Sequence, residues 1–153
     1  MKVREPMRQV VKCFMVNSAG EDLLLKRAAT DTHGSKWETA GGGINDGENI
    51  FDAAVRETLE ETGIETDFFL EGADELVDDQ SGEWFTVYMF RSNKVITDPV
   101  CISKDHSDYI WLDLDKIDDF IAKGNVIDRW TLIQLEYYRY VFDNNPYHLD
   151  HKK

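Results

Sequence analysis

The segment GGGINDGENIFDAAVRETLEETGI, residues 41–64, joins a glycine-rich stretch to a helix with clear signals at both ends. Asn49 can cap the helix start, and Gly63 suits the left-handed conformation that follows a helix end. A helix over residues 50–62 is therefore predicted. It places together three carboxylates that repel one another by about 0.2–0.5 kcal/mol per pair at helical spacing, namely Glu57, Glu60 and Glu61.

This acidic cluster has two interpretations, a solvated helix face or a metal site, and the helix alone leaves both open. Arg56 stands one turn before Glu60 and can orient one carboxylate, but a single cation cannot neutralise three. A hard divalent cation such as Mg²⁺ takes oxygen ligands and suits the cluster. The glycines at 41–43 let the backbone approach a ligand, and Glu48 adds a fourth carboxylate. The opposite helix face is expected to pack on a sheet, through Phe51, Val55, Thr58, Leu59 and Thr62.

Around this helix, apolar and β-prone runs alternate with helical patterns, which indicates an α/β fold. Residues 37–48 hold too many glycines for a regular element. Asn125 is a plausible N-cap of the last helix, and residues 144–153 form a polar tail. Strands are expected at residues 10–16, 23–27, 66–79, 84–92 and 109–117, the last running into a turn, and further helices at 118–124 and 125–142.

The composition limits the classes of function. The 153 residues predict a single domain, and the net charge of −13 argues against broad nucleic-acid binding. No apolar run approaches the ~20 residues of a membrane span, and no apolar signal region is visible, so a cytoplasmic protein without a membrane partner is expected. Cys13 and Cys101 form no motif and are expected to be buried thiols.

Taken together, the motif residues resemble the Nudix box. Gly42, then Glu48, then the run RETLEETGI at 56–64 occupy every polar and glycine position of that 23-residue signature. Thr58, where the pattern prefers an aliphatic residue, is the one departure, and it concerns packing. The resemblance extends over essentially the whole chain. It implies an α/β/α sandwich with a mixed β-sheet between helices.

Family enzymes hydrolyse a nucleoside diphosphate linked to another group, so the resemblance implies a hydrolase of phosphorus-containing anhydrides that uses Mg²⁺, with Mn²⁺ as a substitute. In the implied roles Arg56 orients the glutamates and Glu48 supports them. The implied metal ligands are the Gly41 carbonyl, Glu57, Glu60 and Glu61. A carboxylate near the attacking water can act as base. The candidates for the catalytic carboxylates are Glu57, Glu60 and two residues of a later loop, Asp105 and Asp108.

The region 23–38 resembles that of MutT-type nucleoside triphosphate pyrophosphohydrolases. That resemblance implies substrate contacts by Arg27 and a base-reading role for Asn125, beside their plain readings as a solvated arginine and a helix cap. His106 is expected to be an exposed loop residue. The expected substrate is a nucleoside triphosphate or an oxidised or modified nucleotide, and relatives of this kind often form homodimers.

Two other functions are less consistent with the sequence. A catalytically silent nucleotide-sensing module would usually lose a box carboxylate, and this chain keeps them all. A prenyl diphosphate isomerase would need a catalytic cysteine, and neither Cys13 nor Cys101 stands in the expected glycine-loop context.

Overall fold

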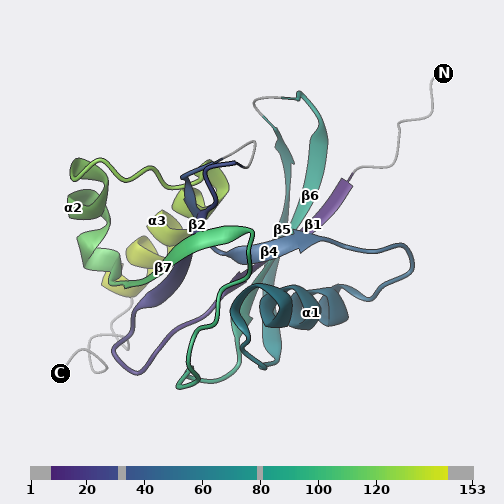
Figure 1. The fold of residues 1–153 in the computed structure, drawn as a ribbon, viewed down its shortest axis with the longest axis horizontal. Helices are drawn as coiled ribbons and strands as arrows, with labels where there is room; N and C mark the ends of the chain where they lie inside the picture. Colours follow the sequence, from purple (N-terminus) through teal and green to yellow (C-terminus); the bar gives the residue numbers. More distant parts are fainter. Residues whose placement is uncertain (1–7, 31–33, 79–80, 145–153) are drawn as a thin grey trace.

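The computed structural model describes residues 8–30, 34–78 and 81–144 (Figure 1). Within these ranges it is a mixed α/β fold, as predicted. The strands are β1 (Arg8–Phe14), β2 (Asp22–Arg27), β3 (Trp37–Glu38), β4 (Ala40–Gly43), β5 (Phe68–Val77), β6 (Trp84–Ser92) and β7 (His106–Leu112). The helices are α1 (Ile50–Thr62), the 3-10 turn η1 (Leu114–Lys116), α2 (Ile117–Ala122) and α3 (Arg129–Asn144).

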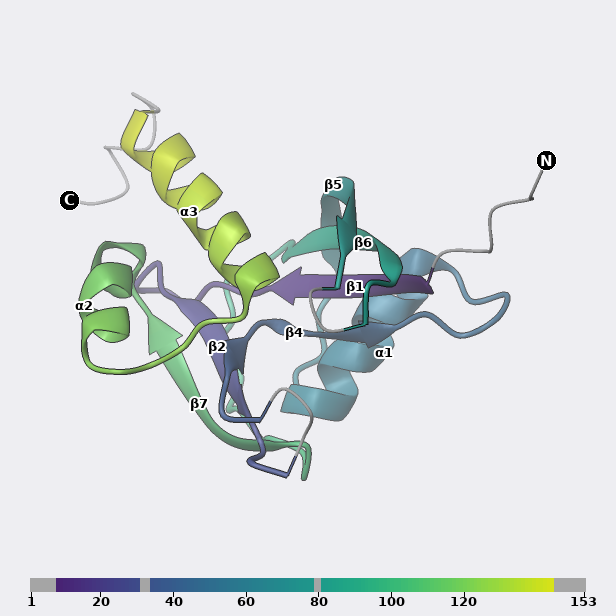
Figure 2. The same ribbon diagram turned by 90° about the horizontal axis from the view of Figure 1, so that it is seen from above.

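Two sheets organise the described chain. The first has the order β4-β1-β6-β5 and is mixed, because β1 runs parallel to β6 while the pairs β1–β4 and β5–β6 are antiparallel. The second has the order β3-β2-β7 and is antiparallel. Figure 2 shows α1 on one side of β1 and β4 and α3 on the other. The predicted sandwich, with a mixed sheet between helices, is confirmed.

The alternation of side chains along β1 builds both halves of the core. Val11 and Cys13 point to the α1 side, where they are fully buried with Ala53 and Ala54. Phe14 points to the other side and meets the ring of Tyr138, on α3, edge to face at 5.2 Å. The central strand is therefore covered on both faces, which fixes the position of α1 against the sheet.

The packing of α1 corrects the predicted buried face. Thr58 and Thr62 are buried and Val55 packs against the core, as expected, but Phe51 is 44% exposed although its ring meets Phe90, and Leu59 is 41% exposed. The helix instead lies on β4 and β1 through its smallest apolar side chains, Ala53 and Ala54, because a glycine-rich strand admits a close approach. The prediction assumed that the apolar side chains of α1 would be the buried ones, whereas the close packing of α1 on the glycine strand favours small side chains.

Three further predictions are wrong in detail. The stretch expected to be irregular contains β3 and β4, because β1 and β2 pair with them and satisfy their backbone groups. The last helix begins at Arg129, where the Asp128 side chain accepts the Thr131 N–H at 3.2 Å, so Asn125 is not its cap. Cys13 is buried, but Cys101 is exposed.

Residues 145–153 of the predicted tail lie outside the described residues. None of the helices in the described ranges has the length and apolar composition needed to cross a membrane.

Candidate functional site

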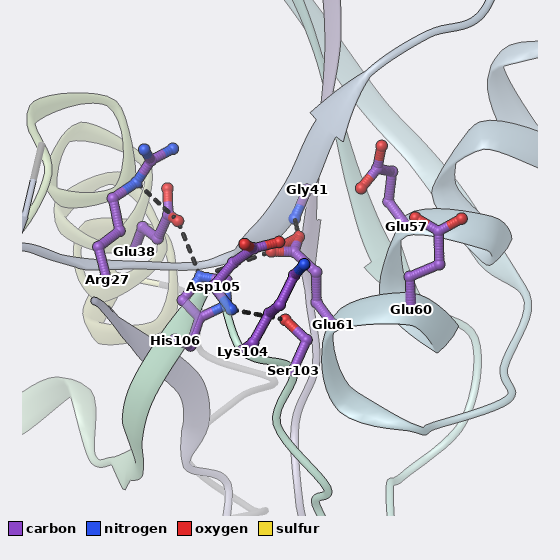
Figure 3. A pocket seen from close by; sticks show the side chains of 10 residues that line it. All are labelled: Arg27, Glu38, Gly41, Glu57, Glu60, Glu61, Ser103, Lys104, Asp105 and His106. Carbon is purple, nitrogen blue, oxygen red and sulfur yellow. Dashed lines mark hydrogen bonds and ion pairs between the residues drawn. The ribbon is translucent and has the colours of Figure 1, made fainter. Parts of the chain in front are cut away.

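A cavity of about 300 Å³ opens where the end of α1 and strand β4 meet the second sheet and the loop before β7. In Figure 3, Glu61 stands between Arg27 and Glu38 on one side and Glu57 and Glu60 on the other. The lining side chains come from both sheets, so the fold itself brings them together. They are Arg27, Glu38, Gly41, Glu57, Glu60, Glu61, Ser103, Lys104, Asp105 and His106.

Glu57 lies directly over the glycine strand. A Cβ atom built on Gly42 would stand 2.6–2.7 Å from the three atoms of the Glu57 carboxylate, so only glycine leaves this carboxylate its place. Burial raises the pKa of Glu57, while its bond to the Arg56 guanidinium, 3.0 Å, acts in the opposite direction. Gly42 of the box therefore leaves the space beside the backbone that the Glu57 carboxylate occupies.

Arg56 ties the acidic cluster together. Its guanidinium contacts Glu48 at 2.7 Å, Glu57 at 3.0 Å and the more exposed Glu60 at 3.3 Å. It also donates to the Gly43 carbonyl at 3.0 Å, which fastens α1 to the end of β4. The hydrogen bonds from Arg56 lower the pKa of Glu48 to about 2. One arginine thus holds three carboxylates in a fixed arrangement.

Glu61 is the most deeply placed of the three helix glutamates, with a side chain 11% exposed. Its Oε1 accepts the Gly41 N–H at 2.8 Å, and its Oε2 lies 3.5 Å from Nε2 of His106. Burial raises the pKa of Glu61 to about 7, although both contacts favour the charged form. A nearby cation would relieve this burial cost, so the position suits a metal ligand.

Glu38, on β3, is surrounded by positive and hydrogen-bonding groups. Lys12 lies 3.2 Å away, the Arg27 Nε 2.9 Å away and the His106 Nε2 3.0 Å away. Burial alone would raise the pKa of Glu38, but Lys12, His106 and Arg27 outweigh it and lower this pKa to about 2. The carboxylate is therefore charged and held from three sides.

The structure brings most of the predicted site residues to the cavity, but not all. Arg27 and Asp105 line it, as do Gly41 and the three helix glutamates. Asp108 does not line it: it is exposed on β7 and accepts the Tyr109 N–H at 2.8 Å. Asn125 does not line it either, because its side chain is bound to the Trp37 indole N–H, at 3.3 Å, and to the Phe120 carbonyl, at 3.0 Å.

Four lining residues were missed by the sequence argument, namely Glu38, Ser103, Lys104 and His106. The expectation of an exposed His106 is wrong. It is 6% exposed, because β7 begins at His106, three residues before the predicted strand, and carries the ring inward. Its place between two aspartates in KDHSD was the only signal available. Glu38 gave none, since a lone glutamate beside a tryptophan fits any strand end.

The donor set fits a hard divalent cation. Glu57, Glu60 and Glu61 offer carboxylate oxygens on one side of α1, and the space beside Gly42 keeps one of them close to the backbone. Oxygen donors of this kind are the ligands that Mg²⁺ prefers. A second grouping, Glu38, Glu61 and His106, is the one in the described part of the chain whose potential ligand atoms all lie within 4.8 Å of one another.

Comparison with known proteins decides the family. Residues 6–134 match the model of the NUDIX domain. The chain belongs to the Nudix family. An RNA pyrophosphohydrolase of Pelagibacter ubique is 25% identical over 139 residues, which cover 79% of this chain and 85% of that protein. The crystal structure of a MutT protein from Methanosarcina mazei Go1 superposes with a TM-score of 0.74 at 25% identity, covering 94% of this chain and 99% of that one.

A shorter match is closer in sequence. An RNA pyrophosphohydrolase of Novosphingobium aromaticivorans is 42% identical over 59 residues, but the match covers 39% of this Nudix chain and only 36% of that relative. The predicted class of enzyme, a Nudix hydrolase acting on phosphorus-containing anhydrides, is confirmed by these likenesses.

Proposed function

We propose that this Nudix protein is a Mg²⁺-dependent pyrophosphohydrolase whose substrate is a nucleoside triphosphate or an oxidised or modified nucleotide. The observation that carries the proposal is the cavity itself, which is lined by three box carboxylates and by two cations, Arg27 and Lys104. Carboxylates alone would repel a polyphosphate, and the cations alone would not select a metal complex. Together they suit a polyanion that arrives with a divalent cation.

The metal would be held by Glu57, Glu61 and Glu60, with the Gly41 carbonyl as a backbone ligand. When bound, Mg²⁺ would neutralise charge on the polyphosphate as the phosphorus–oxygen bond breaks. Arg56 and Glu48 keep the glutamates in place through the ion pairs described above. Arg27 and Lys104 line the same cavity and would contact the phosphate oxygens.

The reaction adds water across one phosphoanhydride bond. The oxygen of water bonds to phosphorus, the bridging oxygen leaves with its electron pair, and a nearby carboxylate accepts the proton that water gives up. Glu60 and Asp105 both line the cavity and are the proposed candidates for this base. Asp108 lies on strand β7, outside the cavity lining, and is therefore not proposed as the base.

A second substrate has one specific observation in its favour. The two relatives compared above are named RNA pyrophosphohydrolases, which makes the 5′-triphosphate end of an RNA a candidate. The chemistry at phosphorus would be the same. We place the free nucleotide first because the net charge of −13 disfavours an extended nucleic-acid contact.

The test is an assay of the purified protein with Mg²⁺ against nucleoside triphosphates, oxidised nucleotides, nucleoside diphosphate sugars and a 5′-triphosphorylated RNA. The expected result is pyrophosphate release from at least one nucleotide, its loss with EDTA and its return with Mg²⁺ or Mn²⁺. Binding without turnover, while a control hydrolase works, would overturn the proposal in favour of a nucleotide-sensing module.

The isomerase alternative has no support at the site. Neither cysteine lines the cavity: Cys13 is buried against α1, with its Sγ 3.8 Å from the Ala54 carbonyl, and Cys101 is exposed beside Gly63. A homodimer and a cytoplasmic location stay predictions.

A further inference from the structure

We propose that Glu38 and His106, two residues outside the Nudix box, form a buried pair that positions the Glu61 carboxylate for metal binding. The inference rests on the proposed function, because it needs Glu61 as a metal ligand. His106 is a positioning residue in this proposal, since it acts on the metal through Glu61.

Glu38 is the fixed point of the pair. Its side chain is 6% exposed and stands among three neighbouring strands. Lys12 of β1 binds its Oε1 at 3.2 Å, and the Nε of Arg27, on β2, binds its Oε2 at 2.9 Å. Charge-assisted bonds of this kind are the stronger ones in proteins. Glu38 therefore cannot turn without breaking its bonds to two cations, of which Lys12 is buried.

His106 links the anchored Glu38 carboxylate to Glu61 on α1. Its side chain is 2% exposed, and its Nε2 lies 3.0 Å from Oε2 of Glu38 and 3.5 Å from Oε2 of Glu61. Carboxylate oxygens only accept hydrogen bonds, so the ring hydrogen belongs on Nε2. The other ring nitrogen, Nδ1, is buried and meets no hydrogen-bond partner among the described residues. The ring is thus held by its Nε2 edge alone.

Glu61 is hydrogen-bonded at one oxygen and faces the His106 ring with the other. The Gly41 N–H donates to Oε1, and Nε2 of His106, which is hydrogen-bonded to Glu38, lies 3.5 Å from Oε2. Without a hydrogen between them, the carboxylates of Glu38 and Glu61 would face each other in a buried place, and like charges repel strongly there. The repulsion would turn Glu61 away, because Glu38 is the anchored partner.

The arrangement also joins the two sheets at the site. Glu61 and Gly41 belong to the half built on the first sheet, whereas Glu38 and His106 stand on the second. The chain before β7 is tied to the end of α1 by the bond from the Ser103 N–H to the Glu61 carbonyl, 3.2 Å, and the His106 N–H in turn donates to the Ser103 carbonyl, 3.2 Å. The backbone thus sets the distance between the segment before β7 and α1, and the His106 ring sets the direction of the Glu61 carboxylate.

The experiment is a titration of the metal-free protein with Mn²⁺, followed by electron paramagnetic resonance, for the wild type, His106→Leu and His106→Gln. Leucine removes the N–H, and glutamine can place an amide N–H near the Nε2 position. Ser107→Ala, at an exposed neighbour on β7 outside the cavity, is the matched control. Residues that orient metal ligands typically contribute about 10- to 100-fold to metal affinity.

The expected result is Mn²⁺ binding about 10- to 100-fold weaker in His106→Leu and close to wild type in His106→Gln and Ser107→Ala. Turnover of His106→Leu should then recover as Mg²⁺ is raised, which a misfolded site would not do. Wild-type affinity in a folded His106→Leu protein would overturn the inference, and so would a folded His106→Gln protein that binds as weakly as a leucine variant.

Two readouts distinguish this inference from direct metal binding by His106 and from the proposed function. Hyperfine coupling of bound Mn²⁺ to a ring nitrogen, absent in His106→Gln, would show His106 as a direct ligand and overturn the positioning role. If the wild type binds Mn²⁺ through Glu57 and Glu61 but hydrolyses no anhydride, the proposed function fails while the positioning of Glu61 stands.

Discussion

Three consecutive glycines, Gly41, Gly42 and Gly43, should respond to alanine in three different ways, and the middle one bears most directly on the site. In Gly42→Ala the new Cβ would stand 2.6–2.7 Å from the Glu57 carboxylate, and ordinary contact begins at 3.4 Å. The carboxylate must therefore move by about 0.7 Å, the difference between these distances. It is the far end of a flexible side chain, so the move should cost little stability.

The cost should appear in catalysis instead. A misplacement near 1 Å in an active site can lower the rate about 100-fold, which corresponds to about 2.7 kcal/mol in the activation free energy. We expect Gly42→Ala to lower kcat by roughly this factor with Mg²⁺ saturating, while the free energy of unfolding stays within about 1 kcal/mol of wild type.

The neighbours supply the controls. A Cβ on Gly43 meets nothing within 4 Å, and Gly43 has no positive φ, so Gly43→Ala should keep wild-type kcat and gain about 0.4–1 kcal/mol of stability from a less flexible unfolded chain. A Cβ on Gly41 would overlap the Val11 carbonyl oxygen, which is backbone and cannot yield easily. Gly41→Ala should therefore lose about 1–3 kcal/mol of stability.

The measurements are steady-state kinetics of pyrophosphate release and urea unfolding for the three variants and wild type. Gly42→Ala with wild-type kcat would refute the reasoning that the place of Glu57 over the glycine strand matters. Equal losses in Gly42→Ala and Gly43→Ala would refute it as well, because only one of the two new methyl groups touches Glu57.

The remaining predictions concern single charges. Glu57→Gln and Glu61→Gln should each lower kcat more than about 100-fold, since each removes a proposed metal ligand, without lowering the melting temperature of the metal-free protein; full activity in both would exclude the metal-site interpretation. Arg56→Lys should lower activity about 10- to 100-fold, because one ammonium cannot reproduce the guanidinium fork, and kinetics at several Mg²⁺ concentrations would show it. Asp22, apart from the site, is buried, and burial raises its pKa to about 7 despite Arg91 at 3.4 Å. A carboxyl group whose folded pKa is raised contributes stability below its unfolded pKa, and this stability is lost as the pH rises. The free energy of unfolding should therefore fall by on the order of 3 kcal/mol between about pH 4 and pH 7, relative to Asp22→Asn. Urea unfolding at several pH values would detect this loss.

The sequence predicted α1 well because the signals there are local. Asn49 accepts the Phe51 N–H, and Gly63 is left-handed with φ 72°, as the capping pattern indicates. Glycine and capping residues act within a few positions, so no distant part of the chain is needed to interpret them. The buried face of α1 was harder, because it depends on the strand that lies beneath, and an apolar pattern does not reveal that this strand is made of glycine.

Strand β3 and the start of β7 illustrate what sequence patterns omit. Trp37 and Glu38 form a two-residue strand that depends on pairing with β2, at Lys26 and Leu25, and on a bridge from Trp37 to Ile127. His106 enters β7 by pairing with Arg27 across a register shift between Lys26 and Arg27. Pairing of this kind is set by tertiary contacts and not by propensity. The site residues on these strands could therefore not be predicted from the sequence.

The same distinction explains why the box alone does not make the site. The box supplies carboxylates from one helix, and Arg56 binds Glu57 and Glu60 within that helix. Glu61 points away from Arg56 toward the second sheet, where its Oε2 faces His106. A helix can arrange its own exposed charges, but a carboxylate buried between two sheets needs partners from the far sheet. The metal affinity of this protein should therefore depend on residues that no box pattern contains, and a variant that keeps the whole box but lacks the His106 N–H should bind metal poorly.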